Sequence, residues 1–294
     1  MDIKRIQLHS DGLTFSALEA GKGTPVFLLH GFPDTPKTWE AQIPALAAAG
    51  YRVIAPTCRG YEVSSQPLNN SYHQLDLGRD LLNWMDNLGI EKAHLVGHDW
   101  GSSIAQTAAL LAPQRFYSLT IMAVPTVRRF FENTLLTPKQ LRNSWYMGFF
   151  QLRWIADLKI KQNDYAFLER LWKDWSPSLE PAPDALSDLK HTFSKPGVIK
   201  ASLSYYRQAL NIFSREFREH QRLFRSPFQL PVMAVSGKED GCIDHNVFLK
   251  SIKQDDFARG VVIREIENAG HFMNQEQPEK INDLLLEWFN KHSM

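Results

Sequence analysis

The stretch Gly97-His98-Asp99-Trp100-Gly101 decides how the rest of this sequence is interpreted. The short run 93–96 before it is typical of the end of a strand, and the small apolar residues of 102–111 after it have helical spacing. A strand, a G-x-D-x-G turn and a helix form the layout of a nucleophile elbow, with Asp in place of the more common Ser. The two glycines permit a tight turn and close packing of strand and helix. We therefore expect Asp99 to project above the sheet edge at the N-terminus of a helix, where an anion is favoured.

Length and composition indicate one large globular protein. The chain has 294 residues, of which 44% are hydrophobic and 22% charged. A net charge of +1 without a long basic block gives no indication of a nucleic-acid partner. No apolar run approaches the roughly 18 residues that a membrane span needs, and residues 1–7 lack the apolar core of a signal peptide, so a cytoplasmic location is expected. Cys58 and Cys242 are far apart, which favours reduced thiols over a disulfide framework.

Strand-like and helix-like segments alternate over most of the chain. The first two strands turn at Asp11-Gly12 and are expected to be antiparallel, whereas the continuous apolar run 25–29 is typical of a parallel strand buried on both faces. The alternation predicts an α/β fold with a mostly parallel, twisted sheet and helices on both faces. The predicted strands are 3–9, 13–19, 25–29, 51–55, 93–96, 117–124, 231–235 and 260–266, and the predicted helices of this part are 38–49, 73–88, 102–111 and 278–292.

The alternation stops after Val127. Residues 128–222 contain only helix-like segments and many aromatic side chains, among which Trp145 and Trp154 are expected to pack within the segment. A helical insertion in a parallel-sheet fold is expected to cover the strand ends, where such folds bind ligands. The sequence therefore predicts a core in two parts, 1–127 and 223–294, with a helical cap over 128–222.

Two further functional loops follow predicted strands. Asp240 comes after the strand that ends at 235, and His271 after the strand that ends near 266. The order of nucleophile, acid and histidine is the order of a hydrolase triad, with Asp99 as the first member. Three such groups at the ends of three strands form a coincidence that ordinary polar loops rarely produce. We therefore predict a triad of Asp99, Asp240 and His271.

The loop 30–34 follows the strand 25–29, at the place where an oxyanion hole is expected. The backbone N–H groups of Phe32 and Trp100 are the predicted donors to a developing oxyanion. The tight turn is suited to a cis peptide before Pro33.

With these motifs in place, the chain resembles the α/β-hydrolase superfamily and, within it, the epoxide hydrolases. The resemblance extends over essentially the whole length and includes the loop 30–34, Arg59-Gly60-Tyr61 and the elbow 97–101. Two segments of the helical insertion, 145–151 and 204–207, are similar to those that hold the two ring-opening tyrosines of that family. The resemblance places these tyrosines at Tyr146 and Tyr206, with Tyr205 as a rival to the second. One departure is Glu62-Val63-Ser64, where the family usually has Gly and a small residue.

The resemblance implies a reaction that suits these residue types. A carboxylate such as Asp99 attacks an epoxide carbon without activation by a base, and two phenols donate to the ring oxygen as it leaves. His271, oriented by Asp240, then activates water against the resulting ester, and the Phe32 and Trp100 N–H groups stabilise the oxyanion. The expected product is a vicinal diol, formed from a small apolar epoxide with no metal or organic cofactor.

Other residues could in principle bind a metal ion or serve as the triad acid. His94 and His98 are four residues apart, which on a strand corresponds to about 13 Å, too far to share a metal ion. The other carboxylates that could serve as the triad acid are Asp34, Glu239 and Asp244, and Asp240 is preferred on the family's G-x-x-D spacing.

A haloalkane dehalogenase has the same fold and an Asp nucleophile, but it commonly carries a side-chain donor where this chain has Phe32. A ligand receptor without catalytic activity on the same fold is a second alternative. Diol formation would identify an epoxide hydrolase, and halide release would identify a dehalogenase. The absence of both products would indicate the receptor. The chain is expected to be a monomer or a homodimer.

Overall fold

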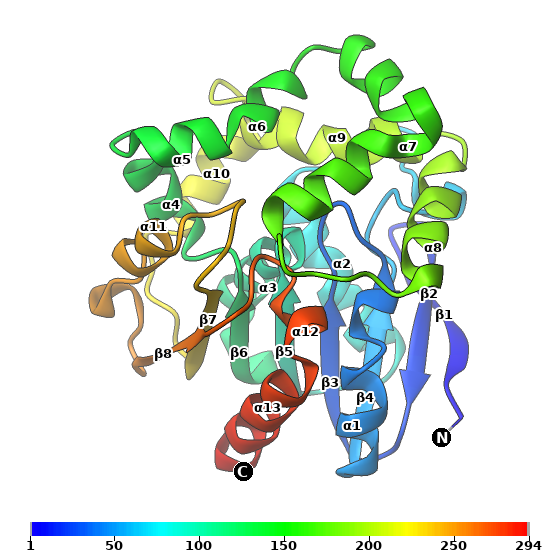
Figure 1. Cartoon of the computed structure of the whole chain (residues 1–294). Helices are drawn as coiled ribbons and strands as arrows, with labels where there is room; N and C mark the ends of the chain where they lie inside the picture. The colour runs from blue at the N-terminus through cyan, green and yellow to red at the C-terminus, as the bar shows by residue number, and fades with distance from the viewer. Residues whose placement is uncertain (1, 293–294) are drawn as a thin grey trace.

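The structure, a computed structural model, describes residues 2–292 and is built on one eight-stranded sheet. The strand order is β1-β2-β4-β3-β5-β6-β7-β8 (Figure 1). β1 and β2 are an antiparallel pair at one edge, β2 is antiparallel to β4, and all later neighbours are parallel. The predicted fold class is therefore confirmed. The strands are β1 Lys4–Ser10, β2 Leu13–Ala20, β3 Thr24–Leu29, β4 Tyr51–Pro56, β5 Ala93–His98, β6 Phe116–Met122, β7 Val232–Gly237 and β8 Val261–Ile266.

Helices cover both faces of the sheet, and two apolar cores result. Val26 and Leu28 of β3 pack in the core beneath α1 and α13, while Phe27 and Leu29 belong to the core beneath α2 and α3. Successive side chains of a strand point to opposite faces, so an uninterrupted apolar run is what a strand buried on both sides requires. The helices of this part are α1 Gln42–Ala48, α2 Gln74–Asn87, α3 Trp100–Leu111, α11 His245–Lys250, α12 Met273–Glu276 and α13 Pro278–His292.

One predicted helix is broken in the structure. The sequence favours a single helix over 38–49, but a 3₁₀ turn, η1 (Pro36–Trp39), comes first and α1 begins afresh at Gln42. Pro44 explains the break, because its ring has no N–H and excludes the carbonyl four residues earlier from the helix. The other 3₁₀ turns are η2 Val63–Ser65, η3 Pro113–Arg115 and η4 Gln254–Asp256.

The described chain between β6 and β7 contains helices and no strand. These helices lie above the sheet (Figure 1) and contact the loops that follow β3 and β4. Trp172 Nε1 donates to the Pro33 carbonyl, and the Tyr205 hydroxyl donates to the Arg59 carbonyl. The helices therefore lie over the carboxyl ends of the strands. They are α4 Val127–Thr134, α5 Pro138–Asn143, α6 Trp145–Phe149, α7 Ile155–Trp175, α8 Pro183–Ser194, α9 Val198–Ala209 and α10 Arg215–Leu223, with α7 kinked at 162–165.

The expectation that the tryptophans of this segment pack inside it is wrong for Trp154, which is 80% exposed, and only partly right for Trp145, which is 43% exposed. Trp154 lies between α6 and α7 with φ of 62°, a backbone conformation that interrupts the helical path at this residue. Aromatic composition alone does not reveal this turn. Among the described residues, no helix is both long enough and apolar enough to cross a membrane.

Candidate active site

Asp99 occupies the turn between β5 and α3, as the elbow motif predicts. Its φ of 52° and ψ of −121° are those of a tight turn, and the residue is 4% exposed. A Cβ atom on Gly97 would lie 2.2 Å from the Gly101 carbonyl oxygen, and one on Gly101 would lie 2.1 Å from the Leu29 carbonyl oxygen. Any larger residue at either glycine would push helix and strand apart. The glycines therefore fix how closely the elbow approaches β3.

The Asp99 carboxylate is held on both sides. The Phe32 N–H donates to Oδ1 at 2.7 Å, and His271 Nε2 lies 3.5 Å from Oδ2. The peptide bond between Phe32 and Pro33 is cis. No acceptor is recorded among residues 2–292 for the Trp100 N–H, the first amide of α3. The loop after β3 thus brings one of the two predicted oxyanion donors onto the carboxylate.

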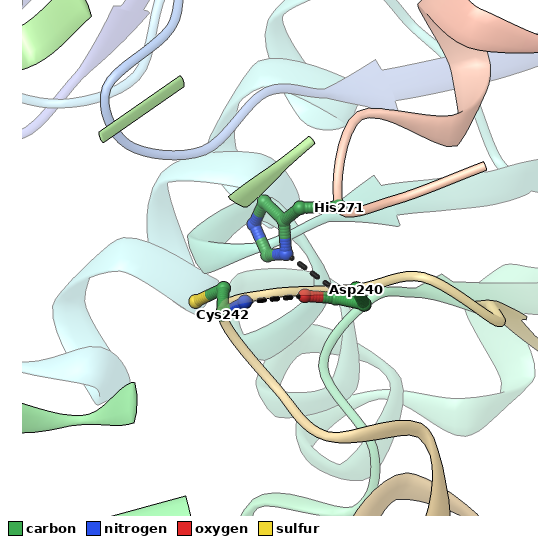
Figure 2. Close-up of side chains that lie close together, drawn as sticks. All are labelled: Asp240, Cys242 and His271. Atoms are coloured by element: carbon green, nitrogen blue, oxygen red, sulfur yellow. Dashed lines mark hydrogen bonds and ion pairs between the residues drawn. The ribbon is translucent and has the colours of Figure 1, made fainter. Parts of the chain in front are cut away.

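His271 joins the two carboxylates of the site. It follows β8, is fully buried, and donates its Nδ1–H to Asp240 Oδ2 at 3.0 Å (Figure 2). The other oxygen of Asp240 accepts from the N–H groups of Cys242 and Ile243, at 2.7 and 2.9 Å. Burial by itself would lower the pKa of His271, but Asp240 and Asp99 outweigh it and raise the pKa to about 10. The His271 ring is therefore a positively charged imidazolium when both carboxylates are ionised.

The rival carboxylates have other partners. Asp244 accepts from the first N–H groups of α11 and pairs with Lys139, and Glu239 is exposed. Asp34 is buried and accepts from the Thr35 N–H, and burial raises its pKa to about 7. Within the described chain, only Asp240 is hydrogen-bonded to the His271 ring.

Tyr146 and Tyr206 face Asp99 from the helices above it. Both are buried, their rings lie 5.8 Å apart, and they line a mostly apolar cavity of about 50 Å³ together with Asp99 and Trp100. The Tyr206 hydroxyl has no hydrogen-bond partner among the described residues, and the Tyr146 hydroxyl lies 3.2 Å from Cys242 Sγ. Burial raises the pKa of both phenols well above the usual value, so both keep their protons at neutral pH.

Tyr205 points elsewhere. Its hydroxyl donates to the Arg59 carbonyl at 2.7 Å, beneath α9 and away from the cavity. Adjacent residues of a helix point about 100° apart, so only one of the neighbouring tyrosines can face Asp99. The geometry places Tyr206, and not Tyr205, at the cavity.

Comparisons with known proteins agree with this fold. A family model described as "alpha/beta hydrolase fold" matches residues 24–278. The chain belongs to the α/β-hydrolase family, and it is a hydrolase. It is 30% identical to Epoxide hydrolase A of Mycobacterium tuberculosis, over 96% of this chain and 95% of that protein, and 30% identical to AB hydrolase superfamily protein YfhM of Bacillus subtilis, over 96% of each. The crystal structure of Epoxide Hydrolase A from Mycobacterium thermoresistibile matches with a TM-score of 0.80 over 98% of each chain at 24% identity, which supports the fold.

In this α/β hydrolase, the two histidines of β5 have separate partners. His94 Nδ1 is 2.8 Å from Ser118 Oγ, and the His98 ring donates to the His271 carbonyl at 2.8 Å. Burial lowers the pKa of both imidazoles to about 3. The spacing argument against a shared metal ion is consistent with these separate contacts.

A different cluster has potential ligand atoms close enough for a metal ion. Atoms of Asp240, Cys242 and His271 lie within 4.8 Å of one another (Figure 2). The donor set does not suit an ion, because Asp240 already accepts three hydrogen bonds and His271 turns an N–H toward it. Burial also raises the pKa of Cys242 well above its usual value, and a metal-binding thiol must lose its proton.

Sequence reasoning missed two residues that contact the site. The backbone carbonyl of Trp175, at the end of α7, accepts a hydrogen bond from the backbone N–H of His271 at 3.0 Å. The Trp175 ring packs against the rings of His271 and Tyr146. Cys242 lies between Asp240 and Tyr146. The position of Cys242 two residues after Asp240 was a usable signal, whereas nothing local identifies Trp175.

Glu62, which departs from the family pattern, accepts hydrogen bonds from the backbone N–H and the hydroxyl of Ser16. These bonds attach the loop of Glu62 to β2.

Proposed function

We propose that this protein is an epoxide hydrolase, which converts a small apolar epoxide to a vicinal diol through a covalent ester of Asp99. The observation that carries the proposal is the pair of buried phenols above a buried carboxylate, one with its hydroxyl unpartnered among the described residues. Buried polar groups nearly always have a partner, so an unpartnered one facing a cavity marks the place of a ligand atom. The name of the Mycobacterium tuberculosis relative is further support.

In the first step, an Asp99 oxygen attacks one carbon of the epoxide and the bond from that carbon to the ring oxygen breaks. The departing oxygen is strongly basic, and it receives hydrogen bonds from Tyr146 and Tyr206 and then a proton from one of them. The Phe32 N–H holds the Asp99 carboxylate at the N-terminus of α3 and orients it for this attack. The product of the step is a hydroxyalkyl ester of Asp99.

In the second step, His271 acts as the base that removes a proton from water, after its own proton has returned to the tyrosine that lost one in the first step. The hydroxide adds to the carbonyl carbon of the ester, the bond from that carbon to the diol oxygen breaks, and the departing oxygen takes the proton of the new carboxyl group, which leaves the Asp99 carboxylate, the diol and a protonated His271. While Asp99 is ionised, the two carboxylates keep His271 protonated. Ester formation removes the charge of Asp99 and therefore lowers the pKa of His271, because only Asp240 then stabilises the imidazolium. The same event that creates the ester thus prepares the base that hydrolyses it. The Phe32 and Trp100 N–H groups would stabilise the oxyanion on the ester carbonyl.

The helical segment 128–222 supplies both phenols, and we propose that it is the cap of this enzyme. The cavity that it closes is about 50 Å³ and mostly apolar, which favours a small apolar epoxide in the observed arrangement. A larger substrate requires α6 and α9 to move apart. All the groups needed for the two steps are side chains and backbone of the chain itself, so the proposed reaction uses no metal or organic cofactor.

The haloalkane dehalogenase alternative is less well supported. Phe32 offers the site a backbone N–H but no side-chain donor for a halide, whereas two phenols suit an epoxide oxygen.

The direct test is to incubate the purified protein with aromatic and aliphatic epoxides and, in parallel, with haloalkanes of similar size. We expect vicinal diols from at least one epoxide and no halide release. Halide release without diol formation would contradict the proposal and would indicate that the protein is a haloalkane dehalogenase. Binding of epoxides without either product would indicate a receptor.

A further inference from the structure

The exposed apolar side chains of this protein are concentrated on one part of its surface. Of the 13 large hydrophobic residues that are exposed in the described chain, 10 lie between residues 135 and 213. We call these ten the outer apolar face. They are Leu135, Leu136, Leu141, Trp145, Leu152, Trp154, Ile155, Leu158, Ile212 and Phe213, with exposed fractions from 43% to 86%. Single exposed apolar residues are ordinary, but a cluster of this size marks an interaction surface.

The residues of the outer apolar face come from successive helices above the sheet and from the loops between them. The face follows α5, α6 and the first half of α7, and the loop before α10 joins it because Arg153, Asn211 and Arg215 line one surface groove. These helices lie on the side of the molecule away from the sheet (Figure 1). Tyr146 on α6 lines the cavity above Asp99, while the neighbouring Trp145 is exposed. The face is therefore the outer side of the helices that close the cavity.

Basic residues accompany the apolar ones. The segment 135–161 contains five cations and a single carboxylate, Asp157. Asp157 forms an ion pair with Arg207 at 2.7 Å. The cations are Lys139, Arg142, Arg153, Lys159 and Lys161. Lys139 pairs with Asp244, but no ion pair is recorded within residues 2–292 for the other four. Glu216 and Glu219 border the face at the groove, where Glu219 pairs with Arg215. The segment 135–161, which carries eight of the ten residues of the face, is thus apolar and positively charged.

The exposure of Trp154 is built into the backbone. A left-handed φ of 62° is costly for a bulky side chain, and here it holds the indole 80% exposed. Exposed tryptophan beside arginine and lysine is the composition of segments that lie at a membrane–water interface, where the indole enters the headgroup layer and the cations contact anionic headgroups.

We infer that the outer apolar face binds the surface of an anionic lipid bilayer, with Trp154 and Phe213 inserted among the headgroups. The charge pattern favours this partner over a second copy of the chain, because two copies joined face to face would bring their uncompensated cations together. A negatively charged bilayer offers the complementary charge and an apolar layer beneath it. This inference concerns the outer side of the helices and does not depend on which reaction the cavity supports.

The test is cosedimentation of the full-length protein with vesicles of phosphatidylcholine alone or of equal parts phosphatidylcholine and phosphatidylglycerol. We expect binding to the anionic vesicles that weakens as salt is added, and much weaker binding to the neutral ones. Trp154→Asn should lower the partition coefficient at least about tenfold, because it removes the most protruding indole and leaves a residue that tolerates the left-handed backbone. Arg153→Gln should lower it about fivefold.

Val63→Ser is the matched control, because Val63 is 57% exposed but lies on η2, away from the face. It should leave vesicle binding unchanged. Phe213→Ser is a second apolar variant, at a loop side chain that is 86% exposed, and it should also lower binding to the anionic vesicles. Equal binding to both vesicle types, no binding to either, or a loss in Val63→Ser as large as that in Trp154→Asn would overturn the inference. A dimer in sedimentation velocity that Trp154→Asn dissociates would also overturn it and assign the face to a second copy.

Discussion

The two halves of the proposed active site are held in opposite ways. In the half carried by the sheet, backbone N–H groups fix both carboxylates, and Asp240 fixes the His271 ring. In the half carried by the helices, the Tyr206 hydroxyl has no partner within the described chain, and the Tyr146 hydroxyl has only a sulfur atom. The difference indicates which groups the protein positions in advance and which it leaves for the substrate to engage.

This contrast has an energetic side. A buried hydroxyl without a partner costs about 1–3 kcal/mol, and an epoxide oxygen at that place would recover it. The hydrogen bonds of the sheet half are already made, so they contribute orientation rather than new binding energy. We therefore expect substitutions in the sheet half to stop individual steps and those in the helical half to slow ring opening in proportion to the donors removed.

The largest effect is expected from Asp99→Asn. The amide retains an acceptor for the Phe32 N–H but lacks the nucleophilic carboxylate, so turnover should fall by at least about 10⁴-fold with no ester formed. Initial rates of diol formation and intact-protein mass spectrometry measure both consequences. Substantial diol formation by this variant would show that the sheet half does not supply the nucleophile.

His271→Gln should separate the two steps. Ester formation precedes the need for a base, so the variant is expected to accumulate the Asp99 ester while steady-state turnover falls about 10³-fold or more. Mass spectrometry after mixing with epoxide should record one substrate mass added per chain. If both steps slowed equally, the assignment of His271 to hydrolysis alone would be wrong.

Tyr206→Phe and Tyr205→Phe form a matched pair on neighbouring residues. The first should slow ring opening about 10- to 100-fold without loss of stability, because the lost hydroxyl has no partner in the described chain. The second should leave ring opening almost unchanged but lower the free energy of unfolding by about 1–3 kcal/mol, because the buried Arg59 carbonyl loses the hydrogen bond from the Tyr205 hydroxyl. Stopped-flow kinetics and chemical denaturation distinguish these outcomes, and the reverse pattern would transfer the donor role to Tyr205.

A smaller effect is expected in the pH dependence of stability. The pKa of His271 is about 10 in the folded protein against an ordinary value of 6.5, so protonation stabilises the fold fully below pH 6.5 and this contribution is lost as the pH rises toward 10. Asp99→Asn removes one of the charges that raise this pKa. Across that range, the wild type should therefore lose more unfolding free energy than the variant, by on the order of 1 kcal/mol. Parallel denaturation profiles would contradict this electrostatic coupling.

The sequence predicted the sheet well because its signals are local. The run 25–29 and the elbow 97–101 each specify a backbone shape through a few adjacent residues. The helical half depends on packing between distant segments. The resemblance placed the second tyrosine at Tyr206, but Tyr205 stayed a rival because the two differ by one step around a helix. For the same reason the sequence could not anticipate the exposure of Trp154, which follows from a single left-handed residue between two helices. The break before α1 was readable from Pro44 but was missed.

The central claim is that an oxygen of Asp99 becomes an oxygen of the diol. A single turnover in water enriched in oxygen-18, with enzyme in excess over epoxide, tests it most directly. Water attacks the carbonyl carbon of the ester, so the first diol should contain no label and the label should be found in the Asp99 carboxylate. Label in that first diol, with none in the protein, would mean that water attacks the epoxide directly and would contradict the account.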